Sequence, residues 1–245
     1  IKNFNLHSGS QMRLTVVRLH NDTYEFIWSF HHILMDGWCV GILIKEFFEI
    51  YESLLQNKTP QLKNIYPYSK YIEWLSTINQ QESYTYWGNY LKDYETSNSL
   101  PITTANTTQQ KYDPQVQTLT IEGNTRQSIK TICATLGITE NVFIQTVWGI
   151  LLSKYNNTND VVFGSVVSGR PAEIEGIEEM IGLFINTIPV RIQTGDNTTA
   201  SELLKQVQQQ STESVTYHYT QLAEIQAAHN LGNNLFDHIM VFENY

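Results

Sequence analysis

Hydrophobic positions change their spacing several times along the first part of the chain. Two early runs are rich in β-branched and aromatic residues, and the residues between them, His20–Thr23, suit a hairpin turn. Further on, the apolar positions recur at the three- and four-residue spacing of an amphipathic helix. The pattern therefore predicts two strands followed by three helices, at residues 12–19, 24–30, 40–55, 68–75 and 82–94.

The second half of the chain alternates between strand-like and helix-like patterns. Asn124 with Gln127, and Thr199 with Glu202, have the spacing of helix capping boxes, and Thr139 is placed to cap a further helix. Interleaved strands and helices are typical of a layered α/β architecture. The expected strands lie at residues 116–121, 160–168, 188–192 and 237–243, and the expected helices at residues 124–136, 139–155 and 199–213.

Residues 95–115 separate the two halves by their composition. They are rich in Thr, Asn, Gln and Ser, they contain two prolines, and no apolar period runs through them. Such a segment is typical of a connection between lobes. We therefore expect three parts, namely residues 1–94, the connection at residues 95–115, and residues 116–245.

Charge and cysteine content narrow the classes of function. The net charge is −9 and the basic residues are scattered, which argues against nucleic acid and anionic membrane surfaces as partners. No signal peptide and no apolar run long enough to span a bilayer is visible in the sequence. Cys39 and Cys133 lie far apart and outside any CxxC pair, which disfavours a disulfide or a metal site and fits a reducing cytoplasm.

A motif with chemical potential lies between the second predicted strand and the first predicted helix. It runs from His31 to Gly37 and contains two adjacent histidines, the acid Asp36 and the glycine. A neutral imidazole accepts a proton near physiological pH, and glycine permits a turn where a Cβ would clash. Adjacent histidines point in different directions from a strand, so they do not suit a common metal ion. Neither a Gly-rich phosphate loop nor a GxSxG nucleophile elbow is present.

Six stretches of the chain, in a fixed order, match the motifs of one known family. They are Phe4–Leu6, Phe30–Trp38, Tyr68–Trp74, Val162–Pro171, Ile181–Thr187 and Phe236–Tyr245. On these residues the chain resembles the condensation domains of nonribosomal peptide synthetases, which are relatives of chloramphenicol acetyltransferase. Two positions depart from the family pattern: Cys39 stands where serine is common, and Gln221 stands where proline is usual.

The resemblance implies an α/β fold of the α+β two-layer sandwich type, in which two acetyltransferase-like lobes form a V-shaped pseudo-dimer around a tunnel. Family members are considerably longer, so we expect the fold to be incomplete at both ends. The implied enzyme is an acyltransferase of antibiotic biosynthesis that joins donor and acceptor thioesters by a peptide bond. Carrier-protein domains deliver both substrates on 4′-phosphopantetheine arms, beside adenylation domains, in the cytoplasm. The chain itself is expected to bind no cofactor or metal.

The same resemblance assigns roles to the residues of the motif. His32 is the implied catalytic residue, acting as general base or as a hydrogen-bond anchor for the attacking amine. His31, Asp36 and Gly37 are expected to shape the motif. For Asp36, an arginine partner is favoured over a triad-like contact with His32. The candidates for this partner are Arg13 and Arg170.

Four further residues are expected to line the substrate tunnel, namely Trp38, Asn186, His218 and Tyr219. Trp38 follows the motif directly, whereas Asn186 could either present its amide to the tunnel or form a turn. His218 and Tyr219 could line the cleft or simply be aromatic residues in front of a helix. His238 is expected to be a packing or surface histidine.

Three other functions remain open from the sequence. An epimerase-type relative has the same two histidines and acid, although Asp36-Gly37-Trp38 fits the condensing type better. An O-acyltransferase of the same superfamily would use a soluble CoA thioester. A catalytically silent module would bind a carrier protein without turnover.

Overall fold

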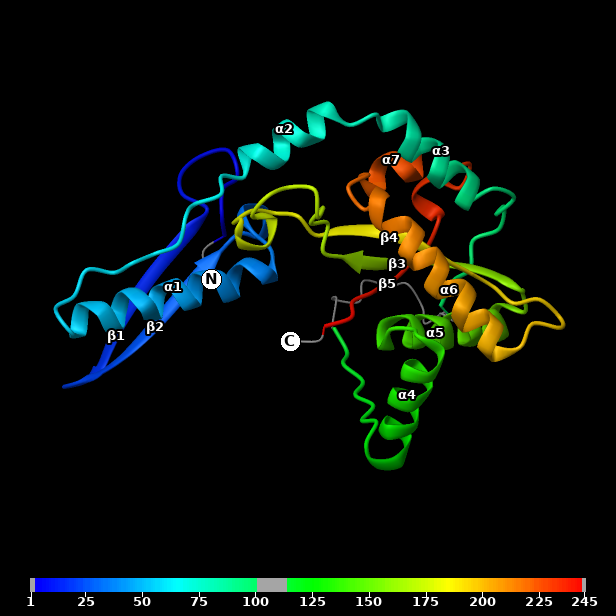
Figure 1. The fold of residues 1–245 in the computed structure, drawn as a ribbon, viewed down its shortest axis with the longest axis horizontal. Coiled ribbons are helices and arrows are strands. Elements are labelled where there is room, and N and C mark those ends of the chain that lie inside the picture. Colours follow the sequence, from blue (N-terminus) through cyan, green and yellow to red (C-terminus); the bar gives the residue numbers. More distant parts are fainter. Residues whose placement is uncertain (1–2, 101–113, 244–245) are drawn as a thin grey trace, which may run out of the picture. The chain divides into compact units, whose positions relative to one another are not determined.

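The computed structural model describes residues 3–100 and 114–243, which fall into two compact units (Figure 1). The first unit comprises Ile1–Ile78 together with Ser168–Ile185, here called the inserted segment. The second unit comprises Asn79–Val167 and Asn186–Tyr245. The predicted connection at residues 95–115 lies mostly outside the described residues. The division into residues 1–94 and 116–245 therefore stays a prediction.

An antiparallel hairpin opens the first unit and confirms the first two predicted strands. β1 (Met12–His20) pairs with β2 (Thr23–Phe30), and Leu14 lies opposite Trp28. The connecting residues Asn21-Asp22 are of the types that favour tight turns. Because β2 ends at Phe30, the motif begins directly where the strand stops.

Two helices complete the regular structure of the first unit. α1 (Gly37–Leu55) follows the motif, and α2 (Ser69–Thr77) confirms the next predicted helix. The inserted segment packs on α2 and holds a short 3₁₀ turn at Ile177–Glu179. The buried core that they share consists of Tyr71, Ile174, Ile177, Met180 and Phe184. This core fixes the inserted segment in the unit that carries the motif.

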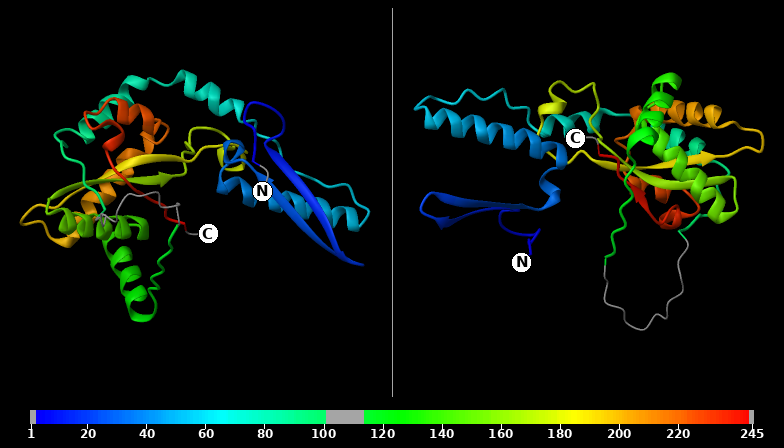
Figure 2. Two further views of the ribbon diagram at one scale, coloured as in Figure 1. Left: turned by 180° about the vertical axis from the view of Figure 1, so that it is seen from behind. Right: turned by 90° about the horizontal axis from the view of Figure 1, so that it is seen from below.

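An apolar groove separates α1 from the hairpin, and the right-hand view of Figure 2 shows these elements side by side. Its volume is about 690 Å³. Phe26 of β2 and Phe47 of α1 contact each other in this groove, with ring centroids 5.5 Å apart. Phe47 is nevertheless 47% exposed. The other lining residues are Met12, Leu14, Trp28, Leu43, Ile44, Glu46, Phe48 and Ile50.

A three-stranded sheet is the centre of the second unit. β3 (Asp160–Val167) pairs antiparallel with β4 (Asn186–Gln193) and parallel with the short β5 (Ile239–Met240). Val161 and Phe163 belong to one hydrophobic core and Val162, between them, to another, as the alternation of a strand requires. The sheet is therefore covered on both faces at β3, which agrees with the largely apolar sequence of this strand.

Five helices surround this sheet (Figure 1). α5 and α6 pack against each other, and α5 contacts β3 and β4. The second core, around Val162, contains Trp87 of α3 and Ile225 of α7. The helices are α3 (Gln80–Tyr90), α4 (Gly123–Leu136), α5 (Glu140–Asn156), α6 (Ala200–Ser214) and α7 (Leu222–Ala227).

The predicted helix caps have different outcomes. Thr139 caps α5 by accepting a hydrogen bond from the N–H of Val142. Thr199 and Glu202 form the predicted capping box at α6, with both reciprocal hydrogen bonds present. The box predicted at Asn124 is wrong, because α4 begins one residue earlier, at Gly123, and its start has no side-chain cap.

Two predicted strands are not formed as expected. Residues 116–121 are described without any strand, and Val116 and Leu119 are 84% and 86% exposed. The predicted strand at residues 237–243 is reduced to the two residues of β5. Both runs have strand-like sequences, but a strand forms only where another strand offers hydrogen-bonding partners.

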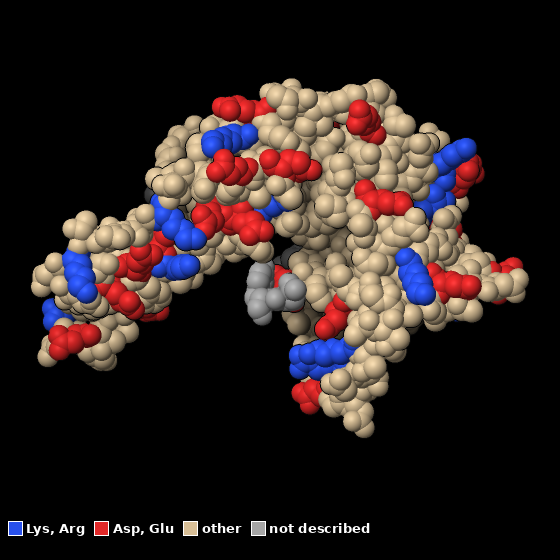
Figure 3. All heavy atoms as spheres, viewed as in Figure 1, with Lys and Arg blue, Asp and Glu red and all other residues tan. Residues whose placement is uncertain are grey.

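On the face shown in Figure 3, Lys and Arg side chains are interspersed with Asp and Glu. Within the described residues, no single helix is long and apolar enough to cross a membrane. The pair α4 and α5 passes that test only when taken together, and it is bent by 106°.

Candidate active site

The motif forms a tight loop between β2 and α1 in the first unit. Its backbone makes a 3₁₀ turn at His32–Leu34, and the N–H of His31 donates to the carbonyl of Gln11 at 2.9 Å. The Nδ1 atom of His31 accepts a hydrogen bond from the N–H of Ile33 at 3.0 Å. The His31 ring also meets the edge of Phe4, with centroids 6.2 Å apart. His31 therefore holds the loop in shape through its own imidazole.

His32 differs from its neighbour because its side chain is exposed. Among the residues that the structure describes, none makes a hydrogen bond to its ring. Its imidazole is therefore available to accept a proton from another molecule, which is the property that general acid–base chemistry needs.

Asp36 is completely buried and anchors the end of the loop. One carboxylate oxygen accepts hydrogen bonds from the Cys39 N–H at 3.3 Å and from Arg170 Nη2 at 3.2 Å. The other accepts from the Phe184 N–H at 3.1 Å. Asp36 thus caps α1 and pairs with Arg170, as one of the two candidate partners predicts. Arg13 instead lies over the Phe4 ring, 4.0 Å from its centroid.

Arg170 connects this carboxylate to the inserted segment. Its side chain is only 4% exposed, and it donates to the carbonyl oxygens of Ile177 and Met180, the latter at 3.0 Å. The guanidinium also lies 4.0 Å from the centroid of the Phe184 ring. A buried ion pair needs such additional partners to offset the loss of hydration. The pair is therefore a structural support of the loop.

Gly37 and Trp38 open α1 at the end of the motif. Gly37 does not have the positive φ that would make use of glycine's conformational freedom, so the special turn predicted for it is not formed here. The Trp38 indole N–H donates to the carbonyl of Glu178 at 2.8 Å, while its side chain remains half exposed. Trp38 thus contacts the inserted segment.

The other predicted tunnel residues belong to the second unit. Asn186 donates from its amide to the carbonyls of His218 and Thr220, at 2.8 and 2.5 Å, and so fastens the turn after α6. His218 Nε2 lies 3.1 Å from the Ser214 hydroxyl, and burial lowers the pKa of His218 to about 4. Burial also raises the pKa of the Tyr219 hydroxyl.

A small cavity of about 100 Å³, lined by both polar and apolar residues, lies beside His218 in the second unit. The amide of Gln145 donates to the Ser165 hydroxyl at 2.9 Å there, and both side chains are buried. Since its burial lowers the pKa of His218, that imidazole is neutral at physiological pH.

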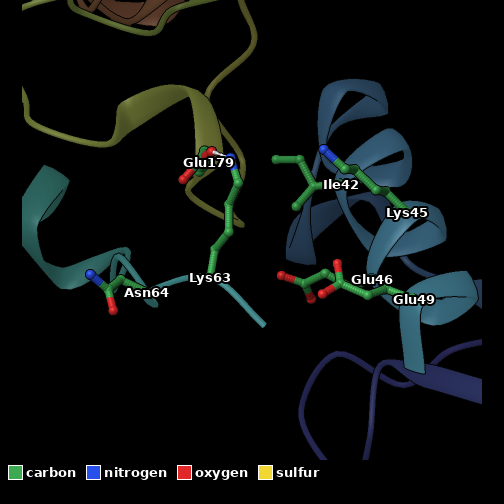
Figure 4. Close-up of a pocket in the computed structure, with 7 residues that line it drawn as sticks. All are labelled: Ile42, Lys45, Glu46, Glu49, Lys63, Asn64 and Glu179. Atoms are coloured by element: carbon green, nitrogen blue, oxygen red, sulfur yellow. Dashed lines mark hydrogen bonds and ion pairs between the residues drawn. The ribbon is translucent and has the colours of Figure 1, made fainter. Parts of the chain in front are cut away.

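A second small pocket, of about 120 Å³, lies in the first unit between α1 and the inserted segment (Figure 4). Lys63 forms an ion pair with Glu179 there, and the neighbouring carboxylate raises the pKa of Lys63. The remaining lining residues are Ile42, Lys45, Glu46, Glu49 and Asn64. Its charges largely compensate one another, and it contains none of the predicted site residues.

His238 has a definite packing role. Its Nδ1 atom lies 2.6 Å from the Asp237 carboxylate, and its Nε2 atom accepts from the Trp148 indole at 2.9 Å. The ring also stacks on Phe163 at 6.1 Å. Both ring nitrogens are engaged, so His238 attaches the last part of the chain to α5, in agreement with the expected packing histidine.

Within the described part of the chain, no three His, Cys, Asp or Glu side chains are grouped so that they could hold a metal ion.

A family model described as "Condensation domain" matches residues 1–245, the entire chain. The chain belongs to the condensation-domain family.

The curated relatives are large synthetases. The chain is 43% identical over 244 residues to bacitracin synthase 3 of Bacillus licheniformis and 45% identical over 242 residues to gramicidin S synthase 2 of Brevibacillus brevis. These matches cover 100% and 99% of this chain but only 4% and 5% of those proteins. The chain is thus similar to one small part of each synthetase.

Solved condensation domains share the fold. The starter condensation domain of rhizomide synthetase, solved with C8-CoA and Leu-SNAC, superimposes with a TM-score of 0.73 at 18% identity. That match covers 97% of this chain and 54% of the solved chain. The first condensation domain of the CDA synthetase gives a TM-score of 0.70 at 14% identity, over 94% of this chain and 51% of that one. The chain therefore has a mixed α/β fold that spans about half the length of these domains.

Three further residues that pack around the motif, Tyr68, Gly182 and Cys39, have no role assigned by the sequence patterns. Gly182 lies so close to Tyr68 that a Cβ at Gly182 would come within 2.0 Å of the Tyr68 ring. The Tyr68 hydroxyl donates to the carbonyl of Leu183 at 2.8 Å. Cys39 lies three positions after Asp36, a spacing that places it at the first turn of a capped helix. That spacing is the signal that could have identified Cys39.

Proposed function

We propose that this chain is part of a peptide-bond-forming condensation domain of a nonribosomal peptide synthetase. The observation that carries the proposal is the contrast between the two histidines of the motif. His31 is engaged within the loop, whereas His32 is exposed and makes no hydrogen bond to the described residues. The buried carboxylate of Asp36 anchors the end of the loop through its ion pair with Arg170. This arrangement supports proton acceptance by His32.

In the proposed reaction, the amine nitrogen of the acceptor attacks the carbonyl carbon of the donor thioester. The tetrahedral species carries a positive charge on nitrogen and a negative charge on oxygen. His32 accepts the proton of the ammonium group or holds the amine by a hydrogen bond, so that collapse back to the reactants is suppressed. The C–S bond then breaks, and the released thiolate takes up a proton as the amide is formed. Positioning of two tethered substrates contributes through effective molarity.

The family membership supports the remaining parts of the proposal. Donor and acceptor carrier-protein domains would deliver the substrates on phosphopantetheine arms, within a synthetase that also contains adenylation domains in the cytoplasm. The complete domain would have the V-shaped pair of acetyltransferase-like lobes, of which this chain supplies about half. Trp38, Asn186, His218 and Tyr219 are proposed to line its tunnel. Because Asn186 already bonds two carbonyls, we propose that it acts by holding the His218–Thr220 turn.

The test is a condensation assay with donor-loaded and acceptor-loaded carrier proteins, read as dipeptidyl thioester by mass spectrometry. We expect product from the wild-type chain and a rate about 10²- to 10⁴-fold lower for His32→Ala, since positioned acid–base groups contribute by that factor. His20→Ala, an exposed histidine in β1, is the matched control and should keep the wild-type rate.

Each alternative has its own outcome in this assay. Equal rates for wild type and His32→Ala would reject the catalytic role of His32. Binding of carrier protein without any product would favour the silent docking module. Inversion of the donor residue without amide formation would favour the epimerase type, and transfer from free CoA thioesters would favour the O-acyltransferase.

A further inference from the structure

Cys39 lies at the centre of the buried hydrogen bonds that join Asp36 of the motif to the inserted segment. It belongs to the first turn of α1, and its side chain is completely buried. Burial raises the pKa of its thiol, so the group stays protonated and chemically quiet. A free cysteine in this position therefore acts through its hydrogen bonds.

The sulfur atom of Cys39 contacts polar groups from two parts of the first unit, the end of the motif and the inserted segment. It lies 3.3 Å from the Asp36 carboxylate and 3.2 Å from the carbonyl oxygen of Gly182. It also accepts from Arg170 Nη2 at 3.3 Å and from the Gly182 N–H at 3.4 Å. One thiol proton and two accepted hydrogen bonds use the full capacity of this sulfur.

The donors that reach this sulfur lie in a buried network. The Gly182 N–H donates to it, Arg170 Nη2 donates to it and to Asp36, and Arg170 Nε is without a partner within the described residues. Removing the thiol would take away the acceptor of the Gly182 N–H and leave Arg170 Nη2 with Asp36 alone, and a buried donor without an acceptor is costly.

A short stretch of backbone connects this hydrogen-bond network to His32. Asp36 lies four residues after His32, and its own N–H donates to the Gly182 carbonyl at 3.3 Å. The other end of the loop is attached through the His31 N–H and Gln11. Any shift of Asp36 or of the first turn of α1 is therefore transmitted to His32 over a few residues of backbone.

We propose that Cys39 is a positioning residue of the condensation site. Its thiol joins Asp36, Arg170 and the Gly182 backbone into one unit, and this unit sets the position of the loop that carries His32. The inference rests on the proposed function for its catalytic consequence, but the structural consequence is measurable without turnover.

Three substitutions separate hydrogen bonding from packing. Cys39→Ser keeps a donor and two acceptor positions, Cys39→Val keeps the volume without polar atoms, and Cys39→Ala removes both. We expect the serine variant to condense within about threefold of the wild-type rate. The valine and alanine variants should be slower by about tenfold or more at saturating substrate, with KM nearly unchanged, since one unsatisfied buried donor corresponds to that factor.

Cys133 supplies the matched control. It is also a buried free cysteine, but it lies in α4, packs in the apolar core of the second unit, and its thiol donates to the Thr139 carbonyl over a long distance of 3.9 Å. Cys133→Val should leave the condensation rate unchanged. All rates are measured at a temperature below the thermal unfolding transition of every variant. Loss of folded protein is then not mistaken for loss of positioning.

Hydrogen–deuterium exchange supplies the readout that does not depend on activity. The amides of Ile33 and Cys39 should exchange faster in the valine and alanine variants than in the wild type and the serine variant. A folded valine variant with wild-type rate and wild-type exchange would overturn the proposal. If the wild-type chain forms no product, the proposed function fails, and the exchange pattern alone then decides whether Cys39 positions the loop.

Discussion

At the scale of single residues, the same side-chain type has different chemistry in different surroundings. His31 accepts a hydrogen bond from the backbone two residues on, His32 is exposed, and His238 is held between a carboxylate and an indole. His218 lies in the second unit, and its burial lowers its pKa to about 4. Of these four histidines, only His32 is exposed and makes no ring hydrogen bond to the described residues, and this supports its proposed reaction with a substrate.

The burial of His218 predicts a specific dependence of stability on pH. The unfolded chain binds a proton at this residue below its ordinary pKa of 6.5, whereas the folded chain binds it only near pH 4. The contribution of His218 to stability is therefore fully present above pH 6.5, and it is lost as the pH is lowered towards 4, by on the order of 3 kcal/mol. Urea unfolding of wild type and His218→Gln at pH 7, 6 and 5 measures the effect, which should be much smaller in the variant.

His20→Gln is the control for this measurement, because His20 is exposed in β1. Its pH dependence should equal that of the wild type. Identical slopes for wild type and His218→Gln between pH 7 and 5 would contradict the prediction.

Residue roles could be predicted where the chain itself brings the groups together. The motif is contiguous, so its position between strand and helix was visible in the sequence. The partner of Asp36 lies 134 positions away, at Arg170, and only the resemblance made it a candidate beside Arg13. The burial of His218 and the contacts of Cys39 depend on packing between distant segments, which periodicity does not contain.

At the scale of elements, a capping pattern in the sequence forms its hydrogen bonds only when the helix begins at the residue that the pattern predicts. Thr199 and Glu202 form both hydrogen bonds of a capping box at α6. Asn124 and Gln127 have the same spacing, but α4 starts at Gly123, so Asn124 falls inside the first turn. Strands depend even more on their surroundings, since residues 116–121 have a strand-like sequence but no assigned strand. The predicted helices were therefore more reliable than the predicted strands.

The two capping patterns predict different consequences of substitution. Thr199→Ala should lower the free energy of unfolding by about 1 kcal/mol, because it removes the acceptor for the Glu202 N–H. Asn124→Ala should have little effect, since its side chain caps nothing. Urea unfolding of both variants checks the pair of predictions. An equal loss of stability in the two variants would show that the structural difference between these helix starts has no energetic weight.

At the scale of the whole molecule, the apolar surface is distributed unevenly within the first unit. The groove between α1 and the hairpin is large and almost entirely apolar, whereas the contacts among Asp36, Cys39 and Arg170 are buried and polar. A two-stranded sheet is at best marginally stable without further strands or a well-packed helix. The chain also spans only about half of the solved condensation domains that it matches. The packing of α1 on the hairpin is thus incomplete along this groove.

An exposed apolar groove of this kind binds apolar dyes, and this gives the last prediction. We expect the chain to enhance the fluorescence of 8-anilinonaphthalene-1-sulfonate, and Phe47→Glu to weaken dye binding by about tenfold, as expected when an aromatic contact area is lost. Tyr155→Glu replaces a similarly exposed aromatic residue outside the groove and should leave binding unchanged. If both variants bind the dye like the wild type, the groove is closed in solution, and the hairpin must pack on α1 more tightly than a 690 Å³ opening allows.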